Sequence, residues 1–77
     1  QEVRMAVQKF VVQLKADGAR RAIAGRSFEE AALAYLEECH PPSDPMGEVV
    51  LIVRQAQSGH EQCFRIEVAS GRAEPCD

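Results

Sequence analysis

Residues 49–53 form the segment that most constrains the fold, because they are five consecutive apolar, mostly β-branched residues, Val-Val-Leu-Ile-Val. Such a run is typical of a strand, which we place at residues 48–56. Side chains alternate between the two faces of a sheet, so this strand puts apolar groups on both of them. The run is far shorter than the roughly 20 residues of a membrane span. We therefore expect a soluble, cytoplasmic domain without membrane contact.

The length and charge of the chain limit what can surround this strand. A chain of 77 residues builds a single core, and its net charge of −3 argues against a domain-wide field for binding phosphates. Its three cysteines, Cys39, Cys63 and Cys76, are too sparse for a secreted disulfide scaffold and favour a reducing compartment. At least one thiol stays unpaired in a monomer. A disulfide between Cys39 and Cys76 is the alternative, if the tail folds back.

Alternating patterns predict three further strands. Residues 7–15 place Phe10, Val12 and Leu14 on one face, and a tight turn at Asp17-Gly18 leads to a shorter returning strand at residues 20–24. After the glycine-containing turn at residues 57–61, the segment 62–68 alternates again. Its inward residues are Phe64, Ile66 and Val68.

A helix is predicted between the two pairs of strands. The sequence Ser-Phe-Glu-Glu at residues 27–30 is a capping box, in which the Ser27 hydroxyl accepts from the Glu30 amide and the Glu30 carboxylate reaches back. A stripe of apolar residues at helical spacing follows: Phe28, Ala32, Tyr35, Leu36 and Cys39. The helix ends at His40 because two prolines come next, and His40 is expected to cap its carbonyl end.

These elements predict an α+β fold in the order β-β-α-β-β. A four-stranded antiparallel sheet carries one amphipathic helix packed on one face. The domain spans residues 7–68. Residues 1–6 are expected to form a disordered N-terminal extension and residues 69–77 a loose C-terminal tail.

Residues with the chemistry of a metal or catalytic site are present but are predicted to lie apart. The possible zinc ligands are Cys39, His40, His60, Cys63 and Cys76. The strand at residues 48–56, roughly 25 Å long at about 3.3 Å per residue, is expected to separate Cys39 from His60. Residues 58–61, Ser-Gly-His-Glu, contain triad residue types, but neighbours in a hairpin turn do not hold triad geometry. We therefore expect no catalytic residue, no metal, no cofactor and no small-molecule ligand, and interpret residues 58–61 as a solvated turn and Cys39 as part of the helix core.

The excess of apolar surface is the most informative feature for function. Val50 and Ile52 point away from the helix beside Val11, and a single helix covers only one face of the sheet. The surface is completed by the outer flank of the helix and by two arginines near the second hairpin, which gives these interaction residues: Val11, Leu33, Val50, Ile52, Arg54 and Arg65. We predict a protein-interaction or regulatory module that forms a homodimer or binds another protein. A monomer with scattered exposed aliphatic residues remains the open alternative.

The second function class is a nucleic-acid-associated regulator. From Lys9 through Asp17-Gly18 to the segment Ser-Phe-Glu-Glu-Ala at residues 27–31, under half of the chain resembles the strand–turn–strand–helix opening of HicB-like antitoxin domains. The resemblance implies regulation together with nucleic acid, for which Arg54 and Arg65 on the sheet would be the contacts. The chain departs from that pattern because no helix-turn-helix or ribbon-helix-helix segment is evident in it. All four aromatic residues are also assigned to the core, which leaves none to stack on bases.

Overall fold

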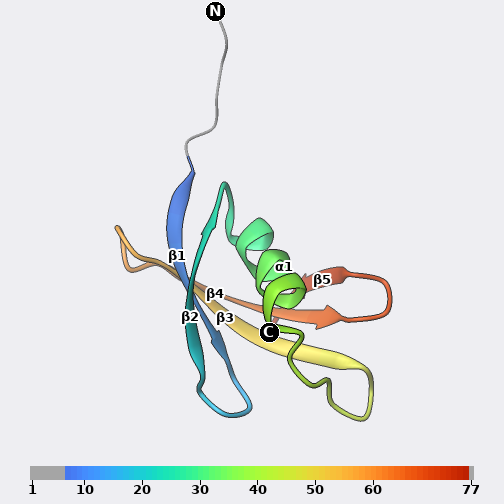
Figure 1. Cartoon of the computed structure of the whole chain (residues 1–77). Helices are drawn as coiled ribbons and strands as arrows, with labels where there is room; N and C mark the ends of the chain where they lie inside the picture. Colours follow the sequence, from blue (N-terminus) through green and yellow to red (C-terminus); the bar gives the residue numbers. More distant parts are fainter. Residues whose placement is uncertain (1–6, 77) are drawn as a thin grey trace, which may run out of the picture.

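The fold is one antiparallel sheet with a helix across one of its faces (Figure 1). The structure is a computed structural model that describes residues 7–76, so the extension expected at residues 1–6 lies outside the described part. The elements in chain order are β1 (Gln8–Leu14), β2 (Arg20–Gly25), α1 (Phe28–Cys39), β3 (Glu48–Gln55), β4 (Glu61–Glu67) and β5 (Arg72–Pro75). The sheet order is β2-β1-β3-β4-β5, and every neighbouring pair is antiparallel. The predicted α+β class is confirmed.

The number of strands is corrected from four to five. The fifth strand, β5, lies within the segment 69–77 that was expected to be a loose tail, and it pairs with β4 so that Ala73 is opposite Ile66. The pairing continues one residue beyond the strand, where the backbone N–H of Cys76 donates to the carbonyl of Cys63 at 2.9 Å. Strand β5 was missed because a short strand with a single inward alanine shows no alternating pattern.

The three hairpin turns of the sheet share one construction. In each, a glycine with φ of 75–79° donates its N–H to the carbonyl four residues earlier at 2.8 Å: Gly18 to Leu14, Gly59 to Gln55 and Gly71 to Glu67. The residue before each glycine accepts, through its side-chain oxygen, from the N–H two residues further on: Asp17 from Ala19, Ser58 from His60 and Ser70 from Arg72. Glycine adopts this left-handed conformation without steric cost, and an Asp or Ser beside it closes the turn.

The ends of α1 are capped largely as the sequence predicts. The Ser27 hydroxyl accepts from the Glu30 N–H at 3.0 Å, whereas the Glu30 carboxylate reaches one residue further than a capping box requires and accepts from the Arg26 N–H at 2.6 Å. At the other end, His40 has φ of 47° and donates its N–H to the Leu36 carbonyl at 3.0 Å. This left-handed residue ends the helix before the prolines.

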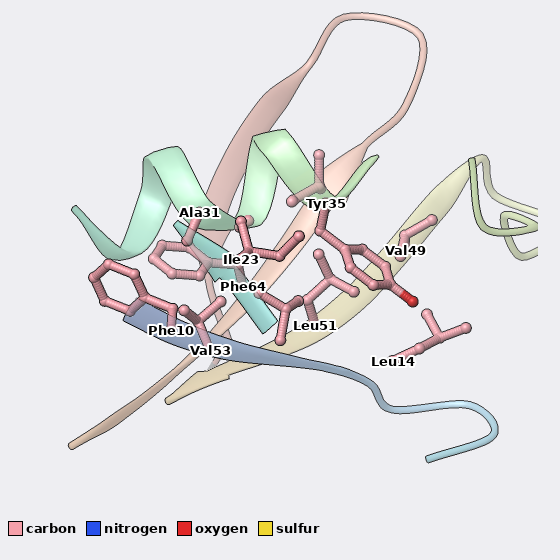
Figure 2. Close-up of a cluster of buried hydrophobic side chains, with 12 residues drawn as sticks. Phe10, Leu14, Ile23, Ala31, Tyr35, Val49, Leu51, Val53 and Phe64 are labelled. Carbon is pink, nitrogen blue, oxygen red and sulfur yellow. The ribbon is translucent and has the colours of Figure 1, made fainter. Parts of the chain in front are cut away.

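The core lies between α1 and one face of the sheet (Figure 2). It contains these buried residues: Phe10, Val12, Leu14, Ile23, Ala31, Ala32, Tyr35, Val49, Leu51, Val53, Phe64 and Ile66. Phe28 of the predicted stripe packs its ring edge-on against Phe10, with ring centroids 5.1 Å apart. Val68, predicted to point inward, is 47% exposed because β4 ends at Glu67 and the next turn begins.

Candidate interaction face

The face of the sheet opposite α1, called the open face below, carries five of the six predicted interaction residues. Along β3, the buried residues Val49, Leu51 and Val53 point to the helix. Val50 and Ile52, which alternate with them, point to the open face and are only partly buried. Val11 of β1 alternates in the same way between the buried Phe10 and Val12. Within residues 7–76, this central strand with apolar residues on both sides is therefore covered on one side only.

Strand register brings these residues together. Ile52 lies opposite Gln13 of β1 and Cys63 of β4, while Val11 lies opposite Arg54 and Val50 opposite Arg65. Both arginines are exposed. The open face thus has an aliphatic centre made by Val11, Val50 and Ile52, with a guanidinium beside it at each end.

Leu33 is not part of this surface. It lies on α1, partly buried against the core, beside a shallow hollow of the helix surface lined by Ser27, Glu29, Glu30, Ala34 and Glu37. The sheet separates this hollow from the open face. Helical spacing showed that Leu33 lies away from the centre of the apolar stripe, but not that the helix carries it on the opposite side of the sheet from Val50 and Ile52.

A disulfide between Cys63 and Cys76 lies on the open face, with the two Cα atoms 5.2 Å apart. The alternative pairing of Cys39 with Cys76 is therefore wrong, and Cys39 is a free, partly buried cysteine at the end of α1. Cys63 follows the same alternation as Ile52, its partner on β3. The bond extends the apolar centre toward β5 and links the edge of the sheet to β4.

Arg54 stands beside a hollow at one end of the open face. Its volume is about 270 Å³, and its lining consists of Val11, Gln13, Arg20, Ile52, Arg54, Ala56 and Glu61. The hollow combines aliphatic side chains with two guanidinium groups and one carboxylate. The hollow therefore offers both apolar and charged contacts at this end of the open face.

Arg65 stands at the other end of the open face among acidic residues. Its Nε lies 4.0 Å from Oε1 of Glu48, and Glu74 is its register partner on β5. A carboxylate therefore competes with any phosphate for this guanidinium. Arg54 and Arg65 lie on one face as predicted, but each has a glutamate nearby, Glu61 beside Arg54 and Glu48 beside Arg65.

Several residues considered for metal binding and catalysis form a disulfide bond or the hydrogen bonds of a turn. Cys63 is in the disulfide and offers no thiolate, and within residues 7–76 no group of three or more His, Cys, Asp or Glu is close enough to hold a metal ion. The Ser58 hydroxyl donates to Oε1 of Gln55 at 2.5 Å and accepts from the His60 N–H at 3.2 Å. These bonds close the β3–β4 turn.

Comparison with known proteins gives a family. No curated protein and no solved structure gave a significant match. In the described part of the chain, no helix has both the length and the apolar composition to cross a membrane. The model of a family of unknown function, DUF5961, matches residues 8–77, which include all five strands, α1 and both bonded cysteines. The chain therefore belongs to the family of unknown function DUF5961.

Proposed function

We propose that this domain is a protein-interaction module that forms a homodimer through its open face. The observation that carries the proposal is the aliphatic centre of Val11, Val50 and Ile52, which no described element covers. Water contact with such a centre is unfavourable by about 25 cal/mol for each Å² of apolar surface. A contiguous apolar patch with a polar rim is typical of a protein-binding surface.

A second copy is the partner that fits best, because the face carries both signs of charge around its centre. Arg20 and Arg54 line the hollow together with Glu61, and Arg65 lies near Glu48 at the other end of the face. A surface with both signs can complement itself across a two-fold axis, which is how most homodimers assemble.

The experiment is size-exclusion chromatography with light scattering on the wild type and on Ile52→Arg. The wild type should elute as a dimer at micromolar concentration, and Ile52→Arg as a monomer with an unchanged circular dichroism spectrum, because a charge is placed in the centre of the apolar contact. Met46→Arg is the matched control. Met46 is 79% exposed in the loop between α1 and β3 and should not affect association.

Two outcomes would remove the proposal. A wild type that remains monomeric at high micromolar concentration shows that the open face is ordinary surface. If Ile52→Arg unfolds, Val50→Arg decides in its place, because Val50 lies two residues along the same face. Unfolding of both variants would assign this face to the core and remove the proposal.

The alternative function, nucleic-acid binding through Arg54 and Arg65, makes a different prediction. The protein has no Trp and one Tyr, so it absorbs little ultraviolet light. Co-purifying nucleic acid would therefore raise the ratio of ultraviolet absorbance to refractive-index signal in the eluted peak. Arg54→Ala with Arg65→Ala should then weaken retention on DNA or RNA with a marked dependence on salt. The glutamates beside both arginines argue against it.

The location proposed for the module depends on the disulfide. Composition favours the cytoplasm, whereas a bond such as Cys63–Cys76 persists in oxidising compartments. We therefore propose that the module works where this bond stays oxidised. Alkylation of free thiols in intact cells, followed by mass spectrometry, should label Cys39 and leave Cys63 and Cys76 unlabelled. Labelling of all three would place the protein in the cytoplasm.

A further inference from the structure

We infer that two copies stack open face to open face about a two-fold axis close to parallel with β3, so that the β1–β2 half of each copy lies over the β4–β5 half of the other. The inference rests on the proposed homodimer and adds its arrangement. Sheet order supplies the symmetry, because β3 is the middle strand with two strands on either side.

The two halves of the open face carry opposite charge. Strand alternation gives the β1–β2 half three exposed basic residues: Lys9, Lys15 directly after β1, and Arg20. The β4–β5 half and the adjoining start of β3 carry four glutamates and two arginines: Glu48, Glu61, Glu67, Glu74, Arg65 and Arg72.

The two arginines of the acidic half are already matched within the chain. Arg72 Nε lies 3.1 Å from Oε2 of Glu74, and Arg65 Nε lies 4.0 Å from Oε1 of Glu48. The acidic half therefore keeps an excess of carboxylates, while the basic half has no carboxylate at its open-face strand positions.

Face-to-face packing of two identical sheets allows two simple axes. An axis across the strands places the β1–β2 half of one molecule over the β1–β2 half of the other. Lys9, Lys15 and Arg20 of one molecule then face the same three residues of the other, which is repulsive. An axis along β3 places the basic half of each copy over the acidic half of the other, and this attraction occurs twice. Sheets stacked in this way are about 10 Å apart and cross at about 30°, within reach of Lys, Arg and Glu side chains.

The same axis explains the centre of the face. Residues on β3 lie at the axis, so Ile52 and Val50 of one copy meet Ile52 and Val50 of the other and exclude water. Arg54 also lies near the axis, and its register partner Glu61 supplies a carboxylate beside it. Self-contact of an aliphatic strand with complementary charges on both flanks is an isologous interface.

The test uses two charge-reversal variants. The first is Lys9→Glu/Lys15→Glu/Arg20→Glu, and the second is Glu61→Lys/Glu67→Lys/Glu74→Lys. All six residues are exposed, so the fold should persist, with circular dichroism as the check. At low salt, each variant alone should dimerise at least about tenfold more weakly than the wild type, because like charges then face each other. An equimolar mixture should form a heterodimer, detected by native mass spectrometry. High salt should reduce these differences.

The control is Glu29→Lys/Glu37→Lys on the outer surface of α1, which changes the net charge in the same direction as the second variant but should leave the dimer unchanged. Either open-face variant dimerising as tightly as the wild type, or a mixture that stays monomeric, overturns this arrangement while the dimer itself stands. A monomeric wild type instead removes the proposed function on which the arrangement rests.

Discussion

The two edges of the sheet are held by different forces. At the β2 edge, Ile23 is 3% exposed beneath α1, and Gly25 lies so close to the helix that an added Cβ would be 3.2 Å from the backbone nitrogen of Ala31. At the β5 edge, Ala73 is the one residue that packs partly against the core, and the Cys63–Cys76 bond links the strand end to β4. One edge is held by burial and the other mainly by a covalent bond.

This difference means that the edges respond to different changes. Burial depends on side-chain volume and is indifferent to thiol reagents, whereas a cross-strand disulfide is broken by reduction whatever the packing around it. A four-residue strand that buries one alanine gains little from the hydrophobic effect. The β5 edge should therefore be the part of the sheet that opens first when the bond is lost.

Truncation of Ile23 should have the largest effect. Ile23→Ala removes buried methyl and methylene groups between β2 and α1 and leaves a cavity, for which about 2–5 kcal/mol of unfolding free energy is expected. Urea unfolding followed by circular dichroism measures the loss, and Ile23→Val, expected to cost about 1 kcal/mol, is the graded control. If Ile23→Ala were as stable as Ile23→Val, the β2 edge would not depend on packing with the helix.

Loss of the disulfide should have the next largest effect, concentrated at the other edge. The bond joins residues 13 apart, and a closed loop of that size stabilises the folded state by about 3 kcal/mol. Cys63→Ala/Cys76→Ala should therefore lower the unfolding free energy, and the amide hydrogens of residues 72–76 should exchange rapidly while those of β2 keep their protection.

A matched comparison uses dithiothreitol on a Cys39→Ala protein, in which every remaining thiol comes from the bond. Hydrogen exchange with mass spectrometry should give the same pattern as the double variant. Protection of residues 72–76 that survives reduction would show that backbone pairing alone holds the β5 edge.

The β5 edge is also where the sequence was least informative. Alternation around Phe10 and Phe64, the apolar run of β3 and the Ser27 cap predicted three strands and the helix, because each of these elements buries several apolar residues. The turn at Asp17-Gly18 predicted β2, in which Ile23 is the one large buried apolar residue. β5 buries part of one alanine and shows no alternating pattern. Its signal was the turn before it: Ser70-Gly71 repeats the pattern of Asp17-Gly18 and Ser58-Gly59.

The disulfide could be predicted only once the pairing of β5 with β4 was known. Cysteine pairing is a non-local property, and spacing alone does not choose among three cysteines. Once β5 returns beside β4, the register that pairs Ile66 with Ala73 carries Cys76 to Cys63. The open face was simpler to predict, since side chains alternate along β3 and place Val50 and Ile52 on the face of the sheet that Leu51 does not occupy. Leu33 was harder, because its place depends on which side of the helix meets the sheet.

The smallest effect is expected at the junction of β2 and α1, where charge adds to burial. Arg26 donates to Glu30 through its backbone N–H at 2.6 Å and through Nη2 at 3.0 Å, and these bonds hold the pKa of the Glu30 carboxyl below its ordinary value. A carboxyl whose pKa is lowered by folding stabilises the native state above its unfolded pKa, about 4.3, and loses that contribution as the pH falls through its folded pKa. Wild type should therefore be more stable than Glu30→Gln at pH 7, and the difference should shrink in acid.

Because the pair is solvent-exposed, the difference in stability between wild type and Glu30→Gln should also shrink in high salt. The variants of the buried Ile23 should show no such dependence on salt. A gap that persists at low pH would mean that Glu30 acts as a neutral hydrogen-bonding cap, and the β2 edge would then be held by packing and capping alone.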